Sequence, residues 1–231
     1  MRYGFFLGVA SCVNLAIVAV GLARYPLIFA QERAPWVVFD LVILVAYAAA
    51  GFVAARLITQ VATPAIRMAT WLGVAAGLLM SADITREYFV DAGQAIGFGV
   101  GLAAFLTTLI IFAIAAGRAS DGSLRRGAAA GAWSAIVCMT LVLAYAWLLN
   151  YLFMDYLAGI LVRDPEYLRG NTLVDPPSYT VWNTLSALAS HGALLPLLGA
   201  VLGTGGAWMN AARKRRDNNP AWRMVQTPGL E

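Results

Sequence analysis

Charged residues are scarce in this sequence. Of its 231 residues, 16 are lysine or arginine and 12 are aspartate or glutamate, and together they make up 12% of the chain. A soluble domain carries about 25%. The hydrophobic share is high, at 61%. This composition excludes soluble, disordered and collagen-like proteins, because too little polar side chain is present to cover a folded surface or to solvate an unfolded chain.

Cysteine, histidine and lysine are scarcer still. The chain holds two cysteines, Cys12 and Cys138, one histidine, His191, and one lysine, Lys214. Because there is no CxxC pair and no cysteine–histidine cluster, we expect neither a disulfide framework nor a metal site. The net charge of +4 is modest and the basic residues cluster in a short tail, which argues against a nucleic-acid partner. No motif identifies a cofactor.

Long apolar runs are abundant. Crossing the hydrocarbon of a bilayer takes roughly 20 apolar residues in a helix. The runs are continuous in Ala, Leu, Val, Ile and Phe, without the alternation typical of barrel strands. We therefore predict an all-α, polytopic membrane bundle over residues 1–212, followed by a basic cytoplasmic tail over 213–231. Its six transmembrane helices are predicted at 3–23, 36–55, 67–83, 94–117, 127–152 and 181–209.

The distribution of basic residues predicts the sidedness. If both termini are cytoplasmic, the inner loops and ends hold 11 lysines and arginines, and the outer loops hold 5. Basic residues favour the cytoplasmic side. We therefore expect a multi-pass protein of a bacterial inner membrane, embedded in the lipid bilayer, with its N-terminus and C-terminus in the cytoplasm. The first apolar run is longer than the roughly 7 to 15 residues of a signal-peptide core, so we expect it to remain as a helix.

A weak internal repeat relates the odd-numbered helices. Arg2, Arg67 and Arg125 each precede a glycine by six residues, and each of these glycines begins a cluster of small residues. The even-numbered helices all end in alanines followed closely by arginine. This pattern predicts three tandem helical hairpins around a pseudo-threefold axis. The alternative is a coincidence produced by an Ala/Gly-rich composition with arginines on the inner side.

Glycines spaced four residues apart occur in five of the six predicted helices. Small residues at this spacing lie on one helical face and allow two backbones to approach closely. They predict either a compact bundle or contacts with a membrane protein partner or a second copy of the chain. The pairs are Gly4/Gly8, Gly73/Gly77, Gly97/Gly101, Gly127/Gly131 and Gly199/Gly203, and the second helix has Ala50/Ala54.

Two ionisable residues interrupt the apolar runs. Asp40 lies in the second run and His191 in the last. Ionisable groups are costly inside a membrane, so both are candidates for a functional site. The alternative for Asp40 is an interfacial, capping or ion-paired carboxylate. For His191 it is a neutral imidazole that is hydrogen-bonded to a neighbouring helix.

Five further charged residues follow odd-numbered helices at the predicted outer face. These are Arg24, Asp83, Arg86, Glu87 and Asp155. We predict that, together with Asp40 and His191, they line an outward-facing polar cavity beneath the loop 156–180. The alternative is an ordinary solvated rim. The loop itself is too charged to span, and we expect it to hold a short interfacial helix that ends at the Pro176–Pro177 break.

Two classes of function fit these features. The first is a transport-type protein, either a small transporter or the membrane subunit of one, with an outward-facing polar site. The second is a non-catalytic accessory or scaffold subunit that packs through its glycine faces into a larger membrane complex. No arrangement of nucleophile and base at one depth indicates an enzyme.

Overall fold

The computed structural model describes residues 2–29, 34–57, 63–90, 95–163, 165–170 and 175–218. Within these ranges every regular element is helical, which confirms the predicted all-α class. The elements are α1 (Arg2–Arg24), the 3-10 helix η1 (Pro26–Phe29), α2 (Ala34–Leu57), α3 (Thr63–Thr85), the π-helix η3 (Arg86–Val90), α4 (Ala95–Arg118), α5 (Leu124–Leu161), α6 (Pro165–Gly170) and α7 (Pro176–Asp217).

Six of the described helices are long and apolar enough to cross a membrane, as predicted. They are α1, α2, α3 together with η3, α4, α5 and α7. Large apolar side chains cover much of their outer surface, including Phe6, Trp71, Leu197 and Val201. Exposed apolar area on this scale would drive aggregation in water. The chain is thus compatible with a multi-pass membrane protein.

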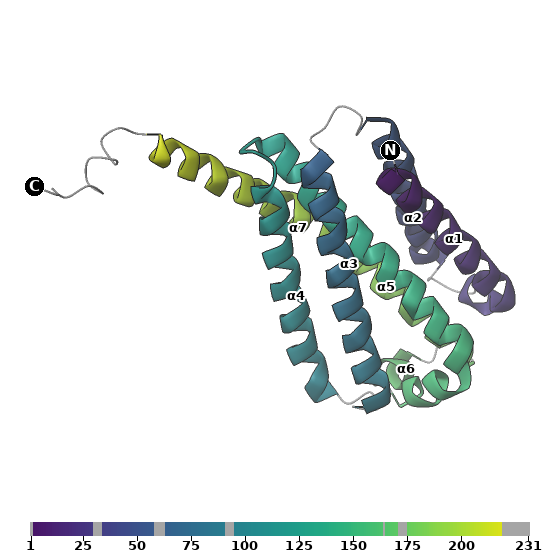
Figure 1. Cartoon of the computed structure of the whole chain (residues 1–231). Helices are drawn as coiled ribbons and strands as arrows, with labels where there is room; N and C mark the ends of the chain where they lie inside the picture. The colour runs from purple at the N-terminus through teal and green to yellow at the C-terminus, as the bar shows by residue number, and fades with distance from the viewer. Residues whose placement is uncertain are drawn as a thin grey trace, which may run out of the picture.

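The bundle has two distinct ends (Figure 1). One end, which we call the α6 end, holds η1, α6 and the start of α7. The other, which we call the tail end, holds the start of α1, the α4–α5 turn and the last turns of α7. Polar contacts join the α4–α5 turn to α7: the Asn210 amide donates to the carbonyl oxygen of Arg118 at 2.7 Å, and Lys214 lies 3.5 Å from Asp121. The helix α7 ends at Asp217, so it extends into the predicted tail over 213–231. Residues 219–231 lie outside the described ranges.

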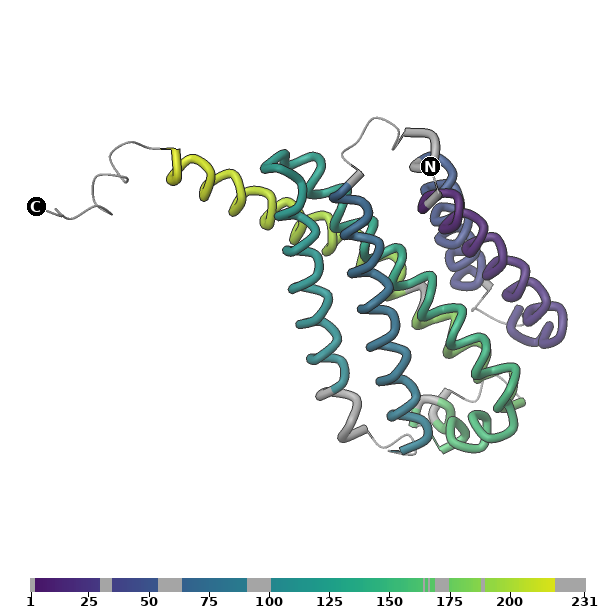
Figure 2. The backbone as a smooth tube through the Cα atoms, in the orientation of Figure 1, coloured from purple at the N-terminus to yellow at the C-terminus, as the bar shows by residue number. Residues whose placement is uncertain are grey.

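The antiparallel pair of α5 and α7 forms the centre of the bundle (Figure 2). The hairpin of α1 and α2 packs against one side of this pair, and the hairpin of α3 and α4 packs against the other. The helices α1 and α2, α3 and α4, and α5 and α7 are thus neighbours, and their arrangement as three tandem hairpins remains a prediction. That they descend from a threefold repeat remains a prediction.

Glycines set the spacing of the central pair. A methyl group on Gly131 would overlap the carbonyl oxygen of Gly199, and one on Gly203 would overlap that of Gly127. The same arrangement joins α1 to α2, where Gly51 faces the backbone of Gly8. Backbones approach this closely only where side chains are absent.

The other predicted glycine pairs also contact the chain's own helices. Gly73 and Gly77 lie against α5, and Gly101 lies against Asp83 of α3. For the Gly97/Gly101 pair, only the packing of Gly101 falls within the described side chains. These glycine faces are therefore covered inside one chain, and a homo-oligomer formed through them remains a prediction.

The loop predicted over 156–180 is more helical than expected. The helix α5 continues to Leu161, past a kink at Phe153 (φ −129°, ψ 27°), and α6 ends at Gly170. The prediction that a helix ends at Pro176–Pro177 is wrong, because these prolines begin α7. Proline is tolerated in a first helical turn, where its missing N–H would have no partner. Asp175 caps this turn by accepting a 2.7 Å hydrogen bond from the Ser178 amide.

Candidate functional site

A cavity of about 600 Å³ lies in the half of the bundle nearest α6. Its walls come from α3, η3, α4, α5, α6 and α7. This volume lies within the range of roughly 300 to 1,000 Å³ found for small-molecule pockets. Among the described residues, none from α1 or α2 lines the cavity.

The deep part of the cavity is apolar. Its walls there are Leu102 and Phe105 of α4 and Met139, Val142 and Leu143 of α5. The contact between Gly131 and Gly199 shows which residues of α5 and α7 lie at the same level of the bundle. Because α5 and α7 are antiparallel, Met139 and His191 lie at the same depth, each eight residues away from that contact. His191 therefore brings a polar ring to an apolar floor.

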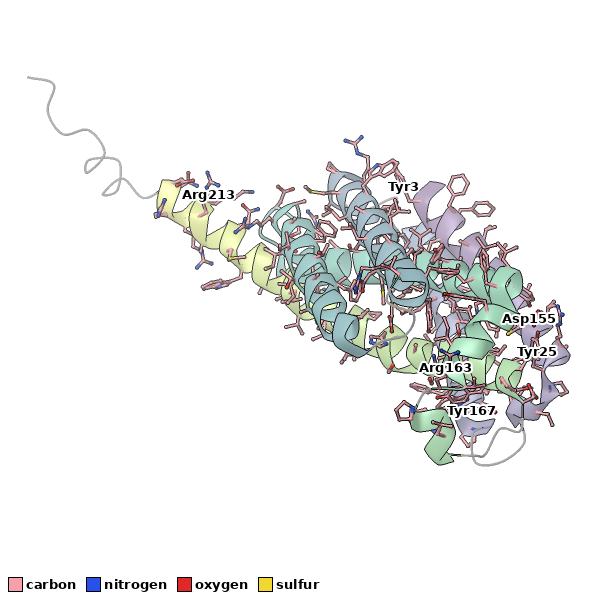
Figure 3. All side chains as sticks on the ribbon, turned by 90° about the horizontal axis from the view of Figure 1, so that it is seen from below. Tyr3, Tyr25, Asp155, Arg163, Tyr167 and Arg213 are labelled. Carbon is pink, nitrogen blue, oxygen red and sulfur yellow. The ribbon has the colours of Figure 1, made fainter. Side chains whose placement is uncertain are left out.

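The part of the cavity nearest α6 is lined by both polar and apolar side chains. Thr180 lies 11 residues before His191, or about 16 Å along a straight helix. The polar side chains of this part are Glu87, Tyr88, Asn150, Arg163, Thr180, Asn183 and Thr184, and the apolar ones include Leu149, Leu157, Ile160 and Leu161. Figure 3 shows Arg163 and Tyr167 near α6 in a view from the α6 end. The cavity thus becomes more polar toward α6.

Hydrogen bonds in the helices fix the orientation of His191. Its Nδ1 lies 2.9 Å from the carbonyl oxygen of Ala187 and 3.1 Å from the hydroxyl of Ser190. A carbonyl only accepts, so the neutral ring carries its proton on Nδ1 and keeps Nε2 as an acceptor. The predicted alternative, a bond from this ring to a neighbouring helix, is not found among the described residues.

Asp83 forms an ion pair within the cavity wall. The Nε and Nη2 atoms of Arg86 lie 3.0 and 2.9 Å from its Oδ1. The other carboxylate oxygen lies against Gly101 of α4, so closely that a methyl group at Gly101 would overlap it. The pair begins at the point where α3 changes into the π-helix η3, a geometry that often marks functional sites.

A hydrogen bond between asparagine and threonine joins the two central helices beside the cavity. The Asn150 amide donates to the Thr184 hydroxyl at 2.9 Å. Our sequence analysis missed both residues, and also Asn183, because it considered only charged side chains. An asparagine inside an apolar run was the available signal.

Two predicted site residues lie on the surface. Arg24 is exposed, with its guanidinium 5.6 Å from the centre of the Tyr25 ring, and Asp155 is exposed on α5. In Figure 3, Asp155 and Tyr25 are drawn on the same side of the molecule. Neither Arg24 nor Asp155 lines the cavity. The structure therefore brings Asp83 and His191 together around one cavity and leaves these two residues outside it.

Asp40 is buried on α2, apart from the cavity. Its side chain is 0% exposed, and neither carboxylate oxygen has a hydrogen-bond partner. The predicted alternative of a capped or ion-paired carboxylate is therefore wrong for the described residues. Two turns further along α2, the Tyr47 hydroxyl donates a 2.5 Å hydrogen bond to the Gly192 carbonyl oxygen of α7.

Comparisons with known proteins add no further indication. The chain matches no protein-family model, no curated protein and no solved structure. Among the described residues, no group of three or more His, Cys, Asp or Glu side chains is placed to hold a metal ion. What the site can do chemically is therefore argued from its geometry alone.

Proposed function

We propose that this chain is a transport-type protein of a bacterial inner membrane whose cavity binds a small amphipathic molecule. The observation that carries the proposal is the change along the cavity from an apolar floor to walls near α6 that mix polar and apolar side chains. A ligand with an apolar body and a polar end matches this change. One hydrogen-bond donor on its body would be accepted by Nε2 of His191.

The predicted sidedness gives the cavity its direction. With both termini in the cytoplasm, the α6 end faces the outside and the cavity reaches toward the outer leaflet. An amphipathic molecule that is dissolved in that leaflet then enters with its polar end at the level of the headgroups. The exposed apolar surface of the helices supports the membrane location.

A pair of matched substitutions tests the binding site. Ala146 lines the cavity, whereas Ala46 on α2 is exposed and lies outside it. The probe is a fluorescent fatty alcohol, titrated into the purified protein in lipid nanodiscs. We expect saturable binding that Ala146→Trp weakens at least tenfold, or by about 1.4 kcal/mol, and that Ala46→Trp leaves unchanged.

Transport is tested with the same variants in sealed proteoliposomes. Wild type and Ala46→Trp should exchange internal for external probe faster than protein-free vesicles, and Ala146→Trp should not. Equal non-saturable partitioning of the probe into all three proteins would overturn the binding proposal. The second candidate, an accessory or scaffold subunit, would then be favoured if a membrane protein co-purifies with the chain in fixed stoichiometry.

A further inference from the structure

Asp40 stands out among the described residues because it is a carboxylate enclosed by apolar side chains. It lies one turn after Val37 and one turn before Leu44 on the same face of α2. Both neighbours are buried and belong to the largest apolar cluster of the protein. The polar end of the Asp40 side chain is therefore buried, and no polar group of the described residues bonds to it.

Among the described residues, no titratable or charged group bonds to Asp40. The elements with the most contacts to α2 are α1, α7 and η1, and Cys138 of α5 lies near Tyr47. The titratable and charged groups on these elements are the following. On α2 itself they are Tyr47 and Arg56, and between α1 and η1 there is Tyr25. On α1 they are Arg2, Tyr3, Cys12 and Arg24, on α7 they are Tyr179, His191 and the basic end, and η1 has none. Arg24 is exposed beside Tyr25, and His191 bonds to Ala187.

An ionised carboxylate is unfavourable in such a place. Moving one charge out of water costs several kcal/mol even after the protein relaxes, and only a partner at short range offsets this cost. A metal cation is a poor partner, because Ca²⁺, for example, takes six to eight oxygen ligands. A proton needs no additional ligand and no additional space. It converts the carboxylate into a neutral acid, which is much cheaper to bury.

We propose that Asp40 is a proton-binding site, and that it is protonated in the conformation described here. Release of the proton requires α2 to move away from α7 far enough to admit water. The O–H bond of the acid then breaks, water takes the proton as hydronium, and the carboxylate is left hydrated. Uptake is the reverse of this step, and no other reactant is needed.

The contact between α2 and α7 connects this site to the cavity. Tyr47 lies two turns from Asp40 and bonds to Gly192, which follows His191 of the cavity wall. A movement of α2 that admits water to Asp40 therefore alters the helix that presents His191. Binding of a ligand and binding of a proton are then linked, and each changes the affinity for the other by the same factor. This linkage rests on the proposed function, whereas the proton site does not.

Infrared spectroscopy tests the proton site without any ligand. The wild-type protein is reconstituted in phosphatidylcholine bilayers at neutral pH and compared with Asp40→Asn. The matched control is Asp83→Asn, which removes a partly exposed carboxylate that is already ion-paired. We expect the wild-type spectrum to contain the carbonyl stretch of a protonated carboxylic acid, shifted on transfer to D₂O. The band should disappear in Asp40→Asn and persist in Asp83→Asn.

A carboxylate band assigned to Asp40 at neutral pH, with no protonated-acid band, would overturn the proposal. That result would mean that a cation or a basic side chain of a partner neutralises Asp40. Thermal unfolding provides a second readout, because asparagine imitates a neutral acid. We expect Asp40→Asn to unfold within a few degrees of wild type, and a loss of folded protein in this variant would also contradict a neutral Asp40.

The linkage is tested with the fluorescent fatty alcohol. In a His191→Ala background, which removes the imidazole from the cavity, the chain should bind it with an affinity that changes with pH, and the added Asp40→Asn substitution should give one affinity at neutral and alkaline pH. Equal pH dependence in both proteins would overturn the linkage and leave the infrared result standing. Absence of saturable binding in both would overturn the proposed function instead.

Discussion

Tyr47 of α2 supplies the hydrogen-bond donor that Pro196 removes from α7. In an α-helix the carbonyl oxygen of Gly192 would accept from the N–H of residue 196, and proline has none. The Tyr47 hydroxyl occupies this vacant position, at 2.5 Å from the oxygen. A polar contact between two helices thus compensates for a break inside one of them, at the level of His191.

This relationship predicts a non-additive pair of substitutions. Tyr47→Phe leaves the buried Gly192 carbonyl without a donor, and we expect a loss of about 1 to 2 kcal/mol in the free energy of unfolding. With alanine at position 196 the helix provides its own donor, so Tyr47→Phe should cost less in the Pro196→Ala background. Reversible unfolding in mixed detergent micelles measures the four proteins. Equal costs in both backgrounds would show that the hydroxyl does not serve this carbonyl.

The glycine contact of the central pair predicts a contrast between two alanine substitutions. Gly131→Ala forces a methyl group against the Gly199 carbonyl, and we expect α5 and α7 to separate at a cost of about 1 to 3 kcal/mol. Gly205 has no atom within 4 Å of the position of an added methyl group. Gly205→Ala should therefore leave stability unchanged or raise it by up to about 1 kcal/mol. Thermal unfolding of both variants in the same detergent measures the difference.

The tautomer of His191 predicts a specific effect on ligand binding. Because Nε2 is an acceptor, His191→Ala should weaken binding of a fluorescent fatty alcohol that carries a second hydroxyl in the middle of its chain by about tenfold, and binding of the alcohol without this hydroxyl much less. Fluorescence titration in nanodiscs measures both affinities. Asp155→Asn and Arg24→Gln, which lie outside the cavity, should change neither. An equal loss of both probes in His191→Ala would indicate a general effect on packing.

Two exposed leucines are suitable positions for a labelling experiment that tests the predicted sidedness. Leu168 lies on α6, and Leu124 begins α5 at the tail end. In a background with Cys12 and Cys138 replaced by alanine, a membrane-impermeant maleimide should label Leu168→Cys in intact cells. It should label Leu124→Cys only after permeabilisation. The opposite result would reverse the orientation of the cavity.

The helical spans were predictable because a run of about 20 apolar residues has few stable arrangements other than a membrane helix. Their ends were less predictable. The fifth span was placed at 127–152, but α5 continues to Leu161, because a helix carries Asp155 without cost where it is exposed. Proline at 176 and 177 was taken as a stop signal, although the same residues are favourable in a first turn.

The candidate site was predictable only in part. Asp83 and His191 lie in one cavity because α3 and α7 both line it. Asp40 was predicted to line the same cavity, but α2 packs on the other flank of the central pair. Apolar runs of similar composition do not indicate which flank each hairpin occupies. The uncharged polar residues of the cavity wall were missed because the sequence analysis considered only charged side chains. Asn150 is identified as a site residue by its hydrogen bond to Thr184 of α7.

The bare backbone contact between α5 and α7 has a mechanical consequence. Where two helices meet through glycines there are no rotamers to rearrange, so sliding or tilting one against the other immediately brings carbonyl oxygens into collision. We expect this pair to behave as a rigid spine during any working cycle. Any movement would then occur in the α1–α2 hairpin and the α3–α4 hairpin. The first carries Asp40 and the second carries Asp83.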